Sequence, residues 1–581
     1  MRPQAILLGT LLIFPVAASS QTTVRPQAPA PATTAPPRDN QQSEKTGTAR
    51  LSGRVTAGDT GKPLRRALVQ AMSPDNPQGR SISTDADGRW ELKALPAASY
   101  RIRVQKGGYV AIFYGQMRPF AQGKVVDVSD GQVVEKLDVS LPRAGVITGT
   151  VTDEFGEPVT GVRVSAMRYG YMNGQRRLTN SGVGALTDDI GQFRLHGLSP
   201  GDYVISAATS FGLLFGSSDD RTGYATTYYP GTLSAIEAQR VRVSEGQEIP
   251  QITFNMAATR IATISGTAVN SSGKPITRGF ISLATLSDGG QGMGMVGTSL
   301  KPDGSFSFAN LAPGDYRVSV QFSPSADDSP SILSGGGGAA AGTEYASAPV
   351  TINGRDVAGL ALVTSTGGVA KGRIVFDGGS PPRTTSPAAL SLSAAAMSAA
   401  LNVFGVGGGS ARIRDDWTFE ISGLFDRRRF RVNNVPTGWY LKSVTQNGSD
   451  VIDTGIDFSQ GQKVADVDVV LSSAVTTLSG AVQDSHAKPV TDYVVVAFAQ
   501  DSSKWGYLTR FVRTARPNQE GRFSLTGLPP DDYYVVALDY VETGEEYDPE
   551  QLEKWKSLAT RVTLADAESK PLALKLASPS Q

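Results

Sequence analysis

Residues 187–203 read TDDIGQFRLHGLSPGDY, and this phrase decides the fold of the chain. Gly191 ends an acidic turn and supplies the positive φ that a tight hairpin needs. Phe193 and Leu195 then alternate on one face of the strand that follows. A Pro-Gly corner leads to Tyr203, which opens another alternating segment. The phrase therefore predicts a hairpin strand joined by a sharp corner to a further strand.

The phrase occurs five times along the 581 residues. Each copy belongs to a unit of about 100 residues, which is a common size for a β-sandwich and too long for a solenoid repeat. Each unit has a glycine in its first alternating segment, and a tyrosine closes the phrase. The opening glycines are Gly53, Gly149, Gly266, Gly372 and Gly480, and the closing tyrosines are Tyr100, Tyr203, Tyr316, Tyr440 and Tyr533. The pattern predicts an all-β chain made of about five β-sandwich modules in tandem.

The fourth copy diverges from the others. In the expected alignment Arg428 replaces the turn glycine, and Phe430 and Val432 hold the strand positions. Val435 then precedes the closing Tyr440. The predicted module ranges, with the fourth module divergent, are 48–143, 144–258, 259–365, 366–473 and 474–577.

Helical periodicity is nearly absent from the chain. The one candidate helix spans residues 549–559, where Leu552, Trp555 and Leu558 share a face. It is expected in the loop before the last two strands of the fifth module.

The N-terminal segment has the pattern of an export signal. Residues 1–20 combine a positive start, an apolar run and small residues before a cut preceding Gln21, which predicts a signal peptide. Residues 21–47 are rich in Pro, Ala and Thr and hold too few large apolar residues to offset their chain entropy, which predicts a disordered tether. The protein is therefore expected to be exported to the periplasm or the cell exterior, with no membrane span after cleavage.

Composition restricts the partners and the chemistry. The 55 Lys and Arg residues nearly balance the 54 Asp and Glu residues, so no large net field attracts nucleic acid. The sequence contains no cysteine, which excludes disulfides and thiolate metal sites. Each module is therefore expected to be stabilised by core packing alone.

No catalytic constellation is recognised in the sequence. The only histidines, His196 and His486, fall at unrelated positions of two modules, which argues against a zinc site or a catalytic triad. The acidic turn at residues 84–88 lacks the further oxygen ligands of a calcium loop and is interpreted as a turn. The Gly-x-Gly-x-x-Gly match at residues 292–297 is not followed by a helix and is interpreted as a loop. No enzymatic activity, metal or cofactor is expected.

The closing tyrosine is interpreted as a packing residue. The proline and glycine before it set the corner, and its ring is expected to lie in the core. Its hydroxyl group is expected to reach a nearby backbone group, as in the tyrosine corner of immunoglobulin-like sandwiches.

Aromatic residues in the loops after the tyrosine strand leave two interpretations open. Phe113, Tyr114, Tyr228 and Tyr229 are the candidate ligand-binding residues, because loop aromatics on sandwich modules can stack on sugar rings. The alternative is that such residues fold back over the open end of the sandwich as a small core. The same choice applies to other loop aromatics, namely Tyr109, Phe120, Tyr224, Tyr540, Tyr547 and Trp555.

The second copy, GTVTDEFGEPV from Gly149 followed by residues 187–203, resembles the bacterial carboxypeptidase regulatory-like domain. The resemblance covers most of residues 48–577, clearly in copies one, two, three and five and weakly in copy four. It implies a transthyretin-like, seven-stranded Greek-key sandwich related to the carbohydrate-binding-like fold. Peptidase activity does not carry over, because no His-x-x-Glu motif is present.

These observations predict an exported, non-enzymatic, multi-module protein with a structural or binding role. The alternative is a carbohydrate-binding protein that uses its loop aromatics. A carbohydrate or a cell-surface protein is a possible partner, nucleic acid is not expected, and the oligomeric state is left open.

Overall fold

The computed structural model describes residues 46–73, 76–116, 118–209, 222–277, 279–286, 295–322, 343–378, 380–382, 385–397, 409–436, 438–459, 461–507 and 509–577. The predicted signal peptide, nearly all of the predicted tether and residues 292–294 of the glycine-rich match lie outside these ranges. The chain divides after Thr46, and Gly47–Gln581 forms one compact unit.

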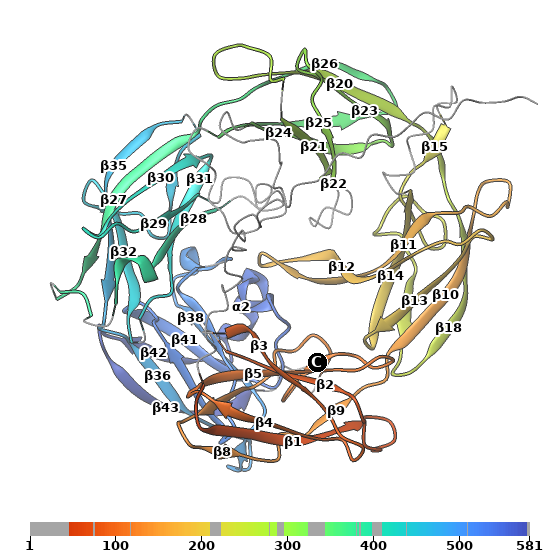
Figure 1. Cartoon of the computed structure of the whole chain (residues 1–581). Helices are drawn as coiled ribbons and strands as arrows, with labels where there is room; N and C mark the ends of the chain where they lie inside the picture. The colour runs from red at the N-terminus through yellow and green to blue at the C-terminus, as the bar shows by residue number, and fades with distance from the viewer. Residues whose placement is uncertain are drawn as a thin grey trace, which may run out of the picture. The chain divides into compact units, whose positions relative to one another are not determined.

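The described residues repeat one architecture five times, which confirms the predicted tandem β-sandwich class (Figure 1). Each repeat, here called a module, pairs a framework sheet around its first strand with a second sheet around the tyrosine strand or its counterpart. Among the described residues the third module has seven strands, and the others carry additional short strands. The predicted boundaries between modules remain a prediction.

The first two modules have the following strands. The framework sheet of the first module contains β1 (Ala49–Ala57), β4 (Arg89–Leu95), β8 (Val133–Val134) and β9 (Val139–Leu141). Its second sheet contains β2 (Leu68–Ser73), β3 (Asn76–Ser83), β5 (Ala98–Gln105), β6 (Ile112–Phe113) and β7 (Val125–Val128). The framework sheet of the second module contains β10 (Gly145–Thr152), β13 (Gln192–Leu198) and β18 (Glu248–Asn255). Its second sheet contains β11 (Val162–Met172), β12 (Gln175–Leu186), β14 (Gly201–Thr209), β16 (Thr227–Tyr228) and β17 (Arg240–Val243), while β15 (Thr222–Tyr224) pairs with β19 (Ala258–Arg260).

The third and fourth modules follow the same plan. The framework sheet of the third module contains β20 (Ala262–Val269), β23 (Ser305–Leu311) and β26 (Val357–Val363). Its second sheet contains β21 (Phe280–Thr285), β22 (Met295–Ser299), β24 (Gly314–Phe322) and β25 (Glu344–Ile352). The framework sheet of the fourth module contains β27 (Gly368–Phe376), β30 (Thr418–Leu424), β32 (Tyr440–Gln446), β33 (Ser449–Asp450) and β35 (Lys463–Ser472). Its second sheet contains β28 (Ser391–Ala396), β29 (Gly409–Arg412), β31 (Arg427–Asn433) and β34 (Ile456–Asp457), and the 3₁₀ helix η2 (Pro387–Ala389) precedes β28.

In the fifth module the two sheets are joined, because β43 pairs with strands of both. One part contains β36 (Thr477–Gln483), β37 (Pro489–Val490), β40 (Arg522–Thr526) and β43 (Ser569–Ala577). The other contains β38 (Val494–Ala499), β39 (Val512–Ala515), β41 (Asp531–Leu538) and β42 (Thr560–Leu564). Two 3₁₀ helices, η3 (Ser502–Lys504) and η4 (Glu545–Tyr547), and the helix α2 (Pro549–Lys556) lie in its loops.

Each module has its own apolar core, formed by alternate residues of its two sheets. Val104, Ile205, Val320 and Val535 are fully buried in the second sheets of four modules. The alternation that predicted the strands therefore also selects the residues that face the core.

Each opening glycine lies inside the first strand of its module. On Gly149 a Cβ atom would overlap the carbonyl oxygen of Ile252 in β18, the last strand of the module. The other four opening glycines face a carbonyl in the same way, those of Leu137, Leu360, Val467 and Leu572. The residue is thus glycine because another backbone approaches it closely. Turn glycines are a separate set, such as Gly191 with φ 70°.

The expected tyrosine corner is present in four modules. The hydroxyl groups of Tyr100, Tyr203, Tyr316 and Tyr533 each donate a hydrogen bond to the backbone carbonyl four residues earlier, at 2.7 to 2.8 Å. All four tyrosines are buried. Burial raises the pKa of Tyr203 to about 12. The packing interpretation of the closing phrase is therefore confirmed in these modules.

The expected alignment of the fourth copy is wrong. Phe419 in β30 faces Gly372, as Phe193 faces Gly149 in the second module, so Trp417 with φ 64° takes the place of the turn glycine. Arg428 lies instead in β31, where it is buried. The alignment failed because β31, in which basic and apolar residues alternate, follows β30 closely in the sequence. Two neighbouring segments with the same period of two cannot be distinguished by spacing alone.

The predicted helix is present as α2 and ends earlier than expected. Its N-cap Asp548 accepts a hydrogen bond from the backbone of Glu550, and Leu552 and Trp555 are buried. Leu558 lies beyond the C-terminal end of the helix and is exposed. The helix covers the outer face of the fifth module's second sheet, where it forms a second small core with β38 and β41.

Candidate functional site

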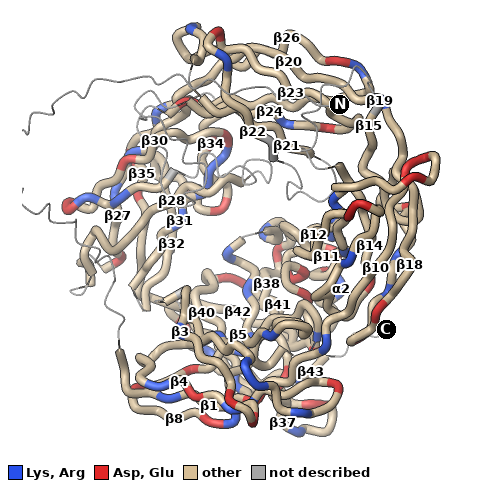
Figure 2. Tube along the Cα trace, turned by 45° about the vertical axis from the view of Figure 1, so that its right-hand side comes forward, with Lys and Arg blue, Asp and Glu red and all other residues tan. Residues whose placement is uncertain are grey.

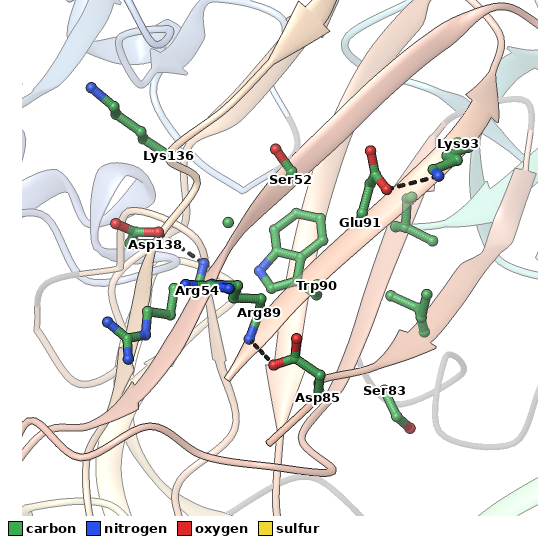
Figure 3. Close-up of a pocket in the computed structure, with 13 residues that line it drawn as sticks. Ser52, Arg54, Ser83, Asp85, Arg89, Trp90, Glu91, Lys93, Lys136 and Asp138 are labelled. Carbon is green, nitrogen blue, oxygen red and sulfur yellow. Dashed lines mark hydrogen bonds and ion pairs between the residues drawn. The ribbon is translucent and has the colours of Figure 1, made fainter. Parts of the chain in front are cut away.

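A shallow hollow of about 1010 Å³ lies on the framework sheet of the first module. Strands β1 and β4 supply much of its lining, and charged residues surround Trp90 there. Figure 3 shows Arg54, Arg89 and Asp138 on one side of Trp90, with Glu91 and Lys93 on the other. The site is built where the Gly53 segment and the hairpin strand pair antiparallel.

The three carboxylates that line this hollow are all engaged. Asp85 accepts hydrogen bonds from the backbone of Asp87 and Arg89, at 2.9 and 2.8 Å. Asp138 accepts one from the backbone of Arg54 at 2.8 Å, and Glu91 forms an ion pair with Lys93 at 2.9 Å. The carboxylates of the lining are therefore held by contacts within the first module.

The pKa of Glu91 agrees with this description. The hydrogen bond from Lys93 holds the pKa of the Glu91 carboxyl below its usual range, with a further contribution from Arg50. A general base at neutral pH needs a raised carboxyl pKa, so this shift is in the wrong direction for acid–base catalysis. Figure 2 shows that residues of both signs are interspersed along the described trace.

Trp90 is the unusual residue of the hollow. It occupies the position at which the other modules have Phe193, Phe306, Phe419 and Phe523. Its ring is buried and its Nε1–H group has no hydrogen-bond partner in the structure. An unpaired buried donor is destabilising, so the substitution of tryptophan for phenylalanine adds a polar group that the module does not use in its own fold.

The predicted residues of the first module, Phe113 and Tyr114, are partly buried at the edge of the second sheet. Phe113 lies in β6, which pairs with β5. Its Cβ atom packs against Gly123 and occupies the space that a side chain at that position would need. Tyr114 packs against the core of the module. Burial raises the pKa of Tyr114, and the charge of Asp138 raises it further.

The predicted residues of the second module, Tyr228 and Tyr229, point to different sides of one sheet. Tyr229 packs against the core and meets Phe254 edge to face, with ring centroids 6.0 Å apart. Tyr228 packs on the outer face against a small cluster that contains Met167 and Val204. The two tyrosines therefore do not form one continuous stacking surface. The four predicted residues stand as two pairs in separate modules, and ligand binding by them remains a prediction.

Of the other loop aromatics, Tyr109, Tyr224, Tyr547 and Trp555 pack against apolar clusters of their own modules, whereas Phe120 and Tyr540 lie between modules. The Arg168 guanidinium of the second module lies 3.5 Å from the ring centroid of Phe120 of the first. The same guanidinium pairs with Glu542 of the fifth module at 2.5 Å. Tyr540 of the fifth module donates a hydrogen bond to the carbonyl of Pro119 at 3.1 Å. Neither interpretation of these residues from the sequence included contacts between modules.

The most exposed aromatic side chain identified is Phe155, at 83%. It lies in the first polar turn of the second module, in the run Asp153-Glu-Phe-Gly-Glu157. Tyr224 is close enough for these carboxylates to raise its pKa, although burial is the larger cause. The sequence carried a signal for this residue, since an aromatic residue within a polar turn has no packing role to explain it.

The remaining candidates for chemistry are dispersed. His196 and His486 are exposed in different modules. Within the described ranges, no group of three or more His, Asp and Glu side chains is placed to hold a metal ion. In the same ranges no helix is both long and apolar enough to cross a membrane.

Comparison with known proteins identifies the family of two modules. Residues 50–142 and 146–256 match the family model of the carboxypeptidase regulatory-like domain, which confirms the resemblance for the first and second modules. No curated protein matches the sequence.

Several solved structures show weak similarity. The Bacillus anthracis TIE protein is 14% identical, with 55% of this chain and 51% of that chain covered and a TM-score of 0.15. A streptococcal ancillary pilin is 14% identical, with 55% and 99% covered and a TM-score of 0.18. A minor pilin of Streptococcus agalactiae is 13% identical, with 36% and 95% covered and a TM-score of 0.20. The chain thus spans about half the length of the first of these proteins. TM-scores this low support no conclusion about the function of this chain.

Proposed function

Since two of its modules are carboxypeptidase regulatory-like domains, we propose that the chain is an exported, non-enzymatic structural protein of the periplasm or cell exterior. The observation that carries the proposal is that the repeated phrase is used for folding in every module. Its opening glycines allow a neighbouring backbone to approach closely, and its apolar residues fill the cores. Four of its tyrosines form corner hydrogen bonds. The same framework copied five times is the design of a modular scaffold.

The loops support the same proposal. Where the modules differ, several charged and aromatic residues are used in contacts with other modules, such as Arg168 with Glu542 and Arg118 with Asp539 at 2.8 Å. Arg510 of the fifth module likewise contacts Asp453 of the fourth at 2.9 Å. Such contacts favour a role for the modules as a connected array.

Export is tested by cell fractionation and N-terminal sequencing of the full chain expressed in a bacterial host. The expected product begins at Gln21 and is recovered outside the cytoplasm. Recovery of an uncleaved chain in the cytoplasm would contradict export. A variant with Leu7→Arg and Leu8→Arg, which breaks the apolar run, is expected to stay in the cytoplasm and serves as the control.

Carbohydrate binding is the second candidate function. The observation in its favour is Phe155, an exposed aromatic residue flanked by carboxylates in the second module. Flat aromatic faces and acidic hydrogen-bond acceptors are the groups with which proteins hold sugar rings. Tyr228 and Tyr229 lie in the same module, and Phe113 and Tyr114 in the first, but all four contribute to packing.

A pull-down with insoluble polysaccharides separates these residues. Phe155→Ala removes an exposed ring and leaves the fold intact, so loss of binding would assign the site to the first polar turn. The double variant Tyr228→Ala/Tyr229→Ala tests the sequence prediction, with a thermal unfolding curve as control for its packing defect. If the unmodified chain binds none of the polysaccharides, carbohydrate binding is removed from consideration.

A further inference from the structure

The first and last strands of every module run parallel and are hydrogen-bonded neighbours. The five pairs are β1 with β9, β10 with β18, β20 with β26, β27 with β35, and β36 with β43. In the second module, for example, Thr150 pairs with Thr253 and Thr152 with Asn255. The terminal strands of each module therefore share one ladder.

Parallel pairing places the two ends of a module at opposite ends of this ladder. The chain enters the second module at the start of β10, near Gly145, and leaves it at the end of β18, near Asn255. A force that pulls these two points apart slides the strands along each other. All the hydrogen bonds of the ladder are then loaded together, whereas strands pulled from one common end separate one bond at a time.

The ladders are connected in series by short segments. Only residues 142–144 separate β9 from β10, and residues 364–367 separate β26 from β27. Residues 473–476 separate β35 from β36. Force carried along the chain therefore enters each of these modules directly through its terminal strands.

The opening glycine strengthens resistance to sliding. A carbonyl of the last strand sits against Gly149, Gly266 or Gly372, in the space that a side chain would fill. At each of these glycines the register of the parallel ladder also shifts by a bulge. A bulge pins the register of a strand pair, so sliding requires this contact to be broken first.

We propose that the modules of this chain bear tension along the chain, with the parallel terminal strands of each module acting as a shear-loaded clamp. The inference deepens the proposed structural role. The number of residue pairs in each ladder also predicts which modules unfold at higher or lower force. The ladders of the fourth and fifth modules each join seven residue pairs, whereas that of the first module is split between β8 and β9. The first module is expected to unfold at the lowest force.

Single-molecule pulling on the full chain tests the clamp in two directions. Because the chain has no cysteine, handles can be attached at engineered positions alone. Ala144→Cys with Ala257→Cys pulls the second module across the ladder in shear. Ala144→Cys with Gln247→Cys attaches both handles at the end of the ladder where β10 and β18 start, because the Val146 amide donates a hydrogen bond to the Gln247 carbonyl there. Pulling on this pair peels the same ladder open from one end.

The expected result is an unfolding force at least twofold higher for the first pair of handles than for the second. Equal forces, or a lower force in the shear direction, would overturn the proposal. A Gly149→Ala change in the shear variant is expected to lower the force, since the last strand must move away. If that change prevents folding, the comparison of the two directions still decides. Purified protein is used throughout, so the result is independent of whether the chain is exported.

Discussion

The Tyr203 hydroxyl donates a 2.7 Å hydrogen bond to the carbonyl of Ser199, four residues earlier in the chain. The ring of Tyr203 is buried between the sheets of the second module, so the bond satisfies both a buried donor and the carbonyl of the corner. The corner between β13 and β14 is thereby tied to the core. Three other modules contain the same bond, and the fourth module has no equivalent among its described residues, because Tyr440 lies in a different strand.

Removal of this hydroxyl is expected to weaken the second module. Tyr203→Phe keeps the ring and leaves the Ser199 carbonyl without its partner, at a cost of about 0.5–1.5 kcal/mol in the free energy of unfolding. Hydrogen exchange of peptides from the second module in the full chain measures the change. Tyr440→Phe is the matched control and is expected to change little. Equal effects of the two substitutions would show that the corner bond is not stabilising.

The opening glycine is expected to tolerate no side chain. In Gly53→Ala the new Cβ would overlap the carbonyl of Leu137, and backbone atoms on both sides must shift, at a cost of about 1–3 kcal/mol. Gly107→Ala in the same module is the control, because a Cβ there meets nothing within 4 Å. Hydrogen exchange of peptides from the first module in the full chain measures both variants. A Gly53→Ala variant as stable as Gly107→Ala would contradict the close-approach explanation.

The contact between the first and fifth modules can be trapped by a disulfide. Ala121 and Glu542 form an antiparallel bridge. Partners of this kind lie about 4.5–5.5 Å apart at Cα, within the range that a disulfide spans. Ala121→Cys/Glu542→Cys is therefore expected to form an intramolecular bond in most molecules under mild oxidation, seen as a mobility shift without reductant.

Cysteine pairs at unrelated surface positions provide the control. Ala121→Cys/Ser557→Cys places the second thiol at an exposed position of the same module. Cross-linking of this pair to the same extent as the bridge pair would show that the thiols meet through unfolding or collisions. The absence of native cysteine leaves no competing bond.

Glu546 is expected to make the fifth module less stable as the pH rises. Its side chain is only 5% exposed, and its Oε2 accepts a hydrogen bond from the Gly544 backbone at 2.7 Å. Burial raises the pKa of the Glu546 carboxyl above its ordinary value of 4.5, and the backbone hydrogen bond from Gly544 acts in the opposite direction. The folded state therefore holds the proton more tightly than the unfolded state, and stability falls as the pH rises from 4.5 through the folded-state pKa.

Glu546→Gln removes the contribution of Glu546 to this pH dependence, because a neutral amide does not titrate, while the neighbouring Glu545, whose pKa burial also raises, keeps its own contribution. The variant is expected to be more stable than the unmodified chain at pH 7, by about 1.4 kcal/mol for each unit by which the pKa is raised, and to match it at low pH. Thermal unfolding between pH 4 and 8 measures the difference. Glu553→Gln, at an exposed site on α2, is the control. Parallel pH profiles for the variant and the unmodified chain would contradict the prediction.

Local sequence patterns determined much of the fold. The turn glycine, the alternating Phe193 and Leu195, and the corner before Tyr203 act within about 17 residues of one another, so period and turn chemistry predict them directly. The all-β class, the tandem repetition, the tyrosine corners and the helix near residue 549 followed from such patterns. The fourth copy shows the limit, since two alternating segments follow each other there and only pairing with Gly372 identifies the hairpin strand.

Long-range contacts were decided by the tertiary structure alone. Gly149 is glycine because of the Ile252 carbonyl, which lies about 100 residues further along the chain in the same module, and no local pattern records that approach. The placement of Phe120 against Arg168 and of Tyr540 against Pro119 likewise depends on which modules meet. The sequence determines which residues are buried and which form turns, because those preferences act within one strand or loop. Which backbone a strand meets depends on packing between distant segments, and that is settled only when the whole chain has folded.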